Sequence, residues 1–175
     1  MRVFGLAGWS GSGKTTLIAK VLPELVRRGV TVSTIKHAHH GFDMDQPGKD
    51  SWKHRAAGAT EVMVASGTRW ALLHELRDEP EPDLEDLATR LASVDLLIVE
   101  GFKRHRHPKI EIIRPSLGKS RLYREDDAIL AVALAEPLDA NETATLKLPA
   151  FDLDAIAEIT DFILANATLL PGIGS

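Results

Sequence analysis

Only a few folds accommodate the glycine-rich segment of this chain, Gly8–Thr15, which has the sequence GWSGSGKT. It fits the pattern G-x-x-x-x-G-K-[ST] completely and stands between an apolar run and a stretch with helical spacing. Glycines let backbone N–H groups turn toward phosphate oxygens, and the helix start adds partial positive charge. In such a loop Lys14 reaches the β- and γ-phosphates and the Thr15 hydroxyl binds Mg²⁺. The segment predicts a site for a nucleoside triphosphate.

Apolar strand patterns alternate with helical patterns along most of the chain. Strands are predicted over residues 2–7, 30–35, 94–99, 110–113 and 129–134, and helices over 14–28, 51–58, 84–91 and 153–164. Pro23 predicts a kink or local break in the first helix, and Ser51 is the expected cap of the second. The final LLPGIGS is expected to be a frayed or swapped tail. Because a strand–helix–strand order favours parallel strands, we expect an α/β fold: a doubly wound, mainly parallel sheet flanked by helices, as in P-loop NTPases.

A hairpin pattern interrupts this alternation. Residues 61–65 and 69–76 are strand-like, and Ser66-Gly67-Thr68 between them suggests a turn. The hairpin predicts that the sheet is mixed.

Length and composition set further limits. The 175 residues fit one nucleotide-binding domain over 1–175. The formal net charge of −4 argues against a nucleic-acid partner, and zero cysteines exclude disulfides and thiolate metal sites. The sequence shows no secretory signal and no apolar run near the ~20 residues of a membrane span. We therefore expect a soluble, cytoplasmic protein without a membrane partner.

A second acidic group is predicted at the end of the most apolar strand, VDLLIVEG. Glu100 ends this strand, where acidic residues of this fold hold Mg²⁺ through water or position water. Asp95 stands at the strand's other end and is expected to be a turn residue, whereas Gly101 allows the backbone to approach the phosphates closely.

A long polar loop over residues 36–51 follows the second strand, where ligands of doubly wound proteins lie. Asp43 or Asp45 is a candidate for Mg²⁺, and the loop's lysines and histidines are candidates for an anion. Two other interpretations stay open. The loop could be merely solvated, or the close-spaced imidazoles could bind Ni²⁺ or Zn²⁺; these imidazoles are His37, His39 and His40.

A basic run over residues 103–109, with the sequence KRHRHPK, follows Glu100 closely. Such runs are usually solvated faces, but its closeness to the phosphate site makes an anionic partner an equal alternative.

Three motifs together resemble one protein family. GxSGSGKTTL at the start, KHxHHxFDxDxPGKDSxxHRxAGA in the middle and a strand ending in VEGFK are similar to the molybdopterin-guanine dinucleotide biosynthesis adapter proteins (MobB). The resemblance runs from Val3 to Lys109 and more loosely to the C-terminal helix. The middle motif is long and unusual, which makes the match specific.

The resemblance implies a small P-loop GTP-binding protein, at most a slow Mg²⁺-dependent GTPase, and usually a homodimer. Such proteins assist a separate guanylyltransferase that attaches GMP to molybdopterin, forming the dinucleotide cofactor. Asp43, Asp45 and Glu100 would lie near the metal with Thr15, and His37, His39, His40 and Arg55 would face the nucleotide or the pterin cofactor. Glu100 and Lys14 would act on the phosphates, which the loop would hold through Gly8, Ser10, Gly11, Ser12, Gly13, Lys14, Thr15 and Thr16.

The chain departs from GTPases at large in one respect. It has no N-K-x-D sequence for reading guanine; the nearest candidate is the carboxylate of Asp139, after Ala135-Glu136-Pro137-Leu138. It departs from some dimeric relatives in another: it lacks the second lysine near the start of the phosphate loop that they use across their interface, because Trp9 follows Gly8. Two alternative functions stay open: a metallochaperone GTPase using the histidine loop, and a small-molecule P-loop kinase in which Arg104 and Arg106 serve as the lid.

Overall fold

The computed structural model describes residues 1–38, 41–102 and 105–170, and the chain divides into two compact units. The first unit comprises Met1–His37 and Leu84–Ser175, and the second comprises Ala38–Asp83. No helix in the described part of the chain is long and apolar enough to span a membrane.

A seven-stranded sheet forms the centre of the first unit. Its strands are β1 (Arg2–Ala7), β2 (Val32–Lys36), β5 (Leu96–Glu100), β6 (Lys109–Ile113), β7 (Ile129–Leu134), β8 (Ala150–Asp152) and β9 (Thr168–Leu169). Six of them pair in the order β2-β5-β1-β6-β7-β8, all parallel, and β9 pairs antiparallel with the start of β1. The predicted mainly parallel sheet is confirmed.

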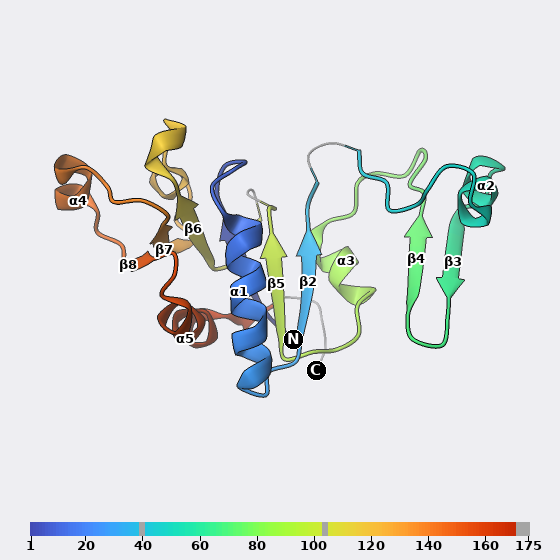
Figure 1. Cartoon of the computed structure of the whole chain (residues 1–175), viewed down its shortest axis with the longest axis horizontal. Helices are drawn as coiled ribbons and strands as arrows, with labels where there is room; N and C mark the ends of the chain where they lie inside the picture. The colour runs from blue at the N-terminus through green and yellow to red at the C-terminus, as the bar shows by residue number, and fades with distance from the viewer. Residues whose placement is uncertain (39–40, 103–104, 171–175) are drawn as a thin grey trace. The chain divides into compact units, whose positions relative to one another are not determined.

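Helices cover both faces of this sheet (Figure 1). The helical elements of the unit are α1 (Lys14–Arg27), α3 (Leu84–Thr89), η1 (Pro115–Leu117), η2 (Leu122–Arg124), α4 (Ala140–Thr145) and α5 (Ile156–Asn166). Side chains alternate along the strands, so Leu96 and Ile98 of β5 pack with α1 and α5, whereas Leu97 and Val99 pack with α3. The predicted helices on two faces are confirmed.

The helix α1 continues through Pro23 without the predicted break. Leu17, Val21 and Leu25 are fully buried on either side of the proline, and each contributes about 1.5–3 kcal/mol by leaving water. This burial offsets the one backbone hydrogen bond that the proline removes. The prediction of a frayed or swapped tail from Leu169 is also wrong at its start, because β9 ends at Leu169 and pairs with β1, and Leu170 is buried. Residues 171–175 lie outside the described residues.

The second unit consists of α2 (Asp50–Ala56) and the strands β3 (Glu61–Ala65) and β4 (Trp70–His74). The two strands form the predicted hairpin, but they make a separate two-stranded sheet. The antiparallel member of the main sheet is therefore β9, not the hairpin. The expected cap is also wrong: Lys49 precedes α2, and the Ser51 hydroxyl donates to Asp45 Oδ1 at 2.8 Å.

Candidate functional site: a phosphate loop with an acidic partner

The segment Gly8–Thr15 forms a tight loop between β1 and α1. Gly8 has φ +145°, and a Cβ there would lie 2.7 Å from both Ile112 O and Ser12 Oγ, so only glycine fits. Gly13, with φ +112°, precedes α1 without a side-chain cap, which leaves the first N–H groups of a 14-residue helix available to an anion. The Ser12 hydroxyl is buried without a hydrogen-bond partner among the described residues. The loop has the backbone form that phosphate requires.

Lys14 lies across this loop. Its Nζ donates to Gly8 O and Trp9 O, each at 2.9 Å, so the ammonium is held at the loop. The Trp9 indole Nε1 donates to Ser120 O at 2.7 Å, which ties the loop to the segment after β6.

Thr15 and Glu100 contact each other, and their predicted role toward magnesium stays a prediction. Thr15 Oγ1 lies 3.2 Å from Glu100 Oε1, and Lys36 Nζ, at the end of β2, lies 3.4 Å from the same oxygen. Glu100 is only 8% exposed. Hydroxyl and carboxylate oxygens are hard ligands of the kind that Mg²⁺ prefers, so Thr15 and Glu100 fit a magnesium ion or its water.

His37 lies beside Glu100. Its backbone N–H donates to Glu100 O at 2.8 Å, and its ring centroid is 4.9 Å from that of Phe102. Gly101 makes room for His37, because a Cβ there would lie 2.9 Å from His37 Cβ; its close approach to the phosphates stays a prediction. Asp95 is a turn residue, as predicted, and accepts from the Thr31 N–H at 2.8 Å.

Arg55, Asp43 and Asp45 contact one another within the second unit. The Arg55 guanidinium donates to Asp43 Oδ1 at 2.9 Å, to Asp45 Oδ2 at 3.3 Å and to Glu75 Oε1 at 2.7 Å. A hydrogen bond from the Asp45 N–H and those from Arg55 lower the pKa of Asp43. This ion-pair cluster gives Arg55 and the two aspartates a structural role; their roles toward nucleotide, pterin and metal stay predictions.

His39 and His40 lie outside the described residues. Among the residues that the structure describes, no three His, Asp or Glu side chains come together as a metal-binding group. The transition-metal interpretation of the histidine loop therefore gains no support from His37.

The basic run is not a solvated face at its far end. His107 is 3% exposed, and Lys109 is buried with its Nζ donating to Asp126 Oδ2 at 2.7 Å. His105 contacts Glu85 at 2.8 Å and His107 at 3.0 Å. Burial, together with the positive charge of Lys109, lowers the pKa of His107 from 6.5 to about 3. His107 and Lys109 turn inward and His105 is half-buried beside Glu85, so these three side chains do not form a surface for an anion; Arg106 is exposed, and Lys103 and Arg104 lie outside the described residues.

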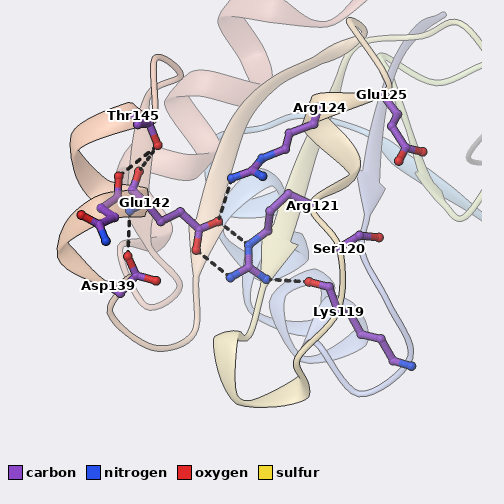
Figure 2. A pocket seen from close by; sticks show the side chains of 9 residues that line it. Lys119, Ser120, Arg121, Arg124, Glu125, Asp139, Glu142 and Thr145 are labelled. Atoms are coloured by element: carbon purple, nitrogen blue, oxygen red, sulfur yellow. Dashed lines mark hydrogen bonds and ion pairs between the residues drawn. The ribbon is translucent and has the colours of Figure 1, made fainter.

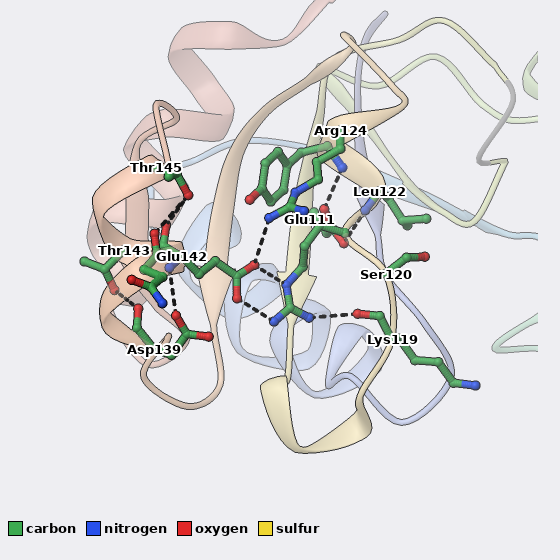
Figure 3. Close-up of polar contacts among 12 residues, drawn as sticks. Glu111, Lys119, Ser120, Leu122, Arg124, Asp139, Glu142, Thr143 and Thr145 are labelled. Atoms are coloured by element: carbon green, nitrogen blue, oxygen red, sulfur yellow. Dashed lines mark hydrogen bonds and ion pairs between the residues drawn. The ribbon is translucent and has the colours of Figure 1, made fainter.

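The segment after β6 was missed by the sequence reasoning. Glu111 on β6 is buried, and burial raises its pKa. Its carboxylate accepts the N–H groups of Leu122 at 2.9 Å and Tyr123 at 2.8 Å, which fixes η2 (Figure 3). An acidic residue within the apolar strand KIEII was the available signal.

Residues 3–135 match the family described as "Molybdopterin guanine dinucleotide synthesis protein B" (MobB). The chain is 41% identical over 165 residues to the "Molybdopterin-guanine dinucleotide biosynthesis adapter protein" of Escherichia coli, covering 93% of this chain and 91% of that protein. The protein of the same name from Haemophilus influenzae is 42% identical over 164 residues, covering 92% of this chain and 86% of that protein.

Solved structures give the same result. A crystal structure of molybdopterin-guanine biosynthesis protein B superposes with a TM-score of 0.70 at 30% identity, covering 93% of this chain and 98% of that chain. The fold also matches Bacillus subtilis MobB, with a TM-score of 0.72 at 24% identity over 96% of this chain and 99% of that chain. This chain is therefore a member of the MobB family.

Proposed function

We propose that this protein is a GTP-binding accessory protein of molybdenum cofactor biosynthesis. It assists a guanylyltransferase that converts the molybdopterin cofactor to its guanine dinucleotide form, and it works in the cytoplasm. The observation that carries the proposal is the phosphate loop with Thr15 Oγ1 at 3.2 Å from Glu100 Oε1, in a chain whose relatives are named adapter proteins for this pathway. The protein is at most a slow Mg²⁺-dependent GTPase.

Nucleotide titration tests the proposal. Calorimetric titration with GTP and with ATP, each with Mg²⁺, is expected to give at least tenfold tighter binding of GTP. A preference for ATP would favour the small-molecule kinase instead. The accessory role has its own test: under limiting GTP, the purified protein is expected to raise the yield of guanylated cofactor from the partner transferase.

The hairpin of the second unit supports the proposal that the protein is a homodimer. Met63, Val64, Trp70 and Leu72 are exposed there, with Trp70 65% accessible, on a sheet of only two strands. An isolated hairpin is marginally stable, and open apolar strand edges pair readily with another chain. Light scattering on the purified protein is expected to give twice the 19.1 kDa chain mass.

Glu100→Gln is expected to leave GTP affinity within about threefold and to slow single-turnover hydrolysis at least tenfold. The substitution keeps the side chain's shape beside Thr15 but removes the negative charge that would hold a Mg²⁺-bound water. Glu158→Gln, on the exposed surface of α5, is the matched control. Equal hydrolysis rates in both variants would reduce Glu100 to a structural role.

A further inference from the structure

A pocket of about 580 Å³ is lined in part by Ser120, which contacts Trp9 of the phosphate loop. Its residues come from the segment after β6 and from the loop and helix after β7, and Figure 2 shows Asp139 and Glu142 on one side with Lys119 and Arg124 on the other. Because β1, β6 and β7 are parallel neighbours, these segments and the phosphate loop follow strand ends at the same edge of the sheet. The hydrogen bond from Trp9 to Ser120 O joins the loop to the pocket's lining.

The charge of the pocket suits a neutral, polar ring. Three cationic and three anionic side chains line it, so their formal charges cancel; these are Lys119, Arg121, Arg124, Glu125, Asp139 and Glu142. Arg121 forms a bidentate ion pair with Glu142, in which Nε donates to Oε1 at 2.5 Å and Nη2 donates to Oε2 at 2.8 Å. Arg124 Nη2 also lies 4.0 Å from Glu142 Oε1, so two of the three cations face a carboxylate, whereas a phosphate site would present several cations that lack one. The volume falls within the range of small-molecule sites.

Asp139 has the carboxylate that could accept hydrogen bonds from a polar ring in this pocket. Its Oδ1 accepts the Glu142 N–H at 2.8 Å, which fixes the orientation of the carboxylate. Its Oδ2 has no hydrogen bond within the described part of the chain, whereas both oxygens of Glu142 are taken by Arg121. A carboxylate only accepts hydrogen bonds, and each of its oxygens can accept two, so Oδ2 and the second lone pair of Oδ1 together match a base edge that presents two donors.

We propose that this pocket binds the base of the nucleotide and that Asp139 selects guanine by accepting from its N1–H and 2-amino groups. This inference rests on the proposed function and names the group that supplies guanine preference in a chain without N-K-x-D. Adenine presents an unprotonated N1 and no 2-amino group, and xanthine presents a 2-oxo group; the carboxylate disfavours both.

Asp139→Asn tests the assignment without removing the helix cap, because asparagine caps a helix as well as aspartate does. Its amide group donates where Oδ2 accepted, so it matches the 2-oxo group of xanthine. We expect GTP affinity to fall at least tenfold and affinity for xanthosine triphosphate to rise at least tenfold, the scale of one bidentate base contact. Calorimetry with GTP, ATP and xanthosine triphosphate measures all three.

Asp152→Asn is the matched control, because the Asp152 carboxylate also accepts one backbone N–H, from Asp154 at 2.8 Å, but lies outside the pocket. It is expected to keep the wild-type order of nucleotides. If Asp139→Asn keeps that order too, the base is read elsewhere and the inference fails, while binding of GTP leaves the proposed function standing. If the wild-type protein binds no nucleoside triphosphate, the proposed function itself fails.

Discussion

Lys14→Ala is expected to weaken GTP binding about 100- to 1000-fold. Lys14 Nζ lies at the loop, 2.9 Å from the carbonyls of Gly8 and Trp9, and a bound phosphate would draw charge-assisted hydrogen bonds from it. Each such bond contributes about 1.5–3 kcal/mol, so the loss of two near the lower end of that range, about 3–4 kcal/mol in all, gives an affinity change of that size. Calorimetric titration with GTP and with ATP measures the effect, which is expected for both nucleotides because both carry the same phosphates.

The fold is expected to survive this change, since Lys14 stands outside the buried stripe of α1. Lys20→Ala is the matched control: Lys20 lies further along α1 and pairs with Asp154 at 2.5 Å on the exposed surface. The control is expected to bind GTP as the wild type does. Unchanged affinity in Lys14→Ala would mean that phosphates do not bind at this loop, and the proposed function would then lose its basis.

The elements with strong local patterns were predictable from the sequence. The phosphate loop, α1 and the strand ending in Glu100 each carry a spacing or motif that local chemistry dictates. The neighbour relations were less accessible. The order β1, α1, β2 suggests adjacent strands, yet β5 lies between them. All residues of β5 are buried, whereas β2 is partly exposed, so burial places β5 inside the sheet and β2 at its edge.

The pocket was out of reach for the same physical reason. It is built from η2, the six-residue helix α4 and the loops beside them, and such short elements show no hydrophobic periodicity. Asp139 was noticed only as a lone carboxylate, although its cap to Glu142 is local and has the D-x-x-E spacing of a helix start. The pairing of Arg121 with Glu142 joins segments far apart in the chain, and a long-range polar contact of this kind leaves no spacing in the sequence.

The basic run contains a turn that its composition hides. The His107 N–H donates to His105 O at 3.1 Å, so the chain turns just before β6 begins at Lys109. His107 and Lys109 are buried, whereas Arg106 is exposed. Counting charges therefore predicts a solvated surface where the backbone turns two of the described side chains inward.

The burial of His107 is expected to make the protein lose stability in mild acid. The pKa of His107 is about 3 in the folded protein, against 6.5 when the side chain is free in water. As pH falls below 6.5, His107 binds a proton in the unfolded chain but stays neutral in the folded protein, so the free energy of unfolding falls until the pH nears 3. Between pH 7 and pH 5 the titration of His107 lowers the free energy of unfolding by about 2 kcal/mol.

His107→Asn separates this effect from the titration of other groups near it, which include His105, Glu85 and Asp126. The asparagine leaves a gap beside Gly5, so the variant is expected to be less stable at pH 7. Its further loss between pH 7 and pH 5 is expected to be smaller than that of the wild type by about 2 kcal/mol, because the titrating ring is gone. His54→Asn, at an exposed position of α2, is expected to follow the wild type. Urea denaturation at pH 7, 6 and 5 measures all three proteins, and equal pH slopes in His107→Asn and the wild type would mean that the buried ring carries its proton, balanced by Asp126.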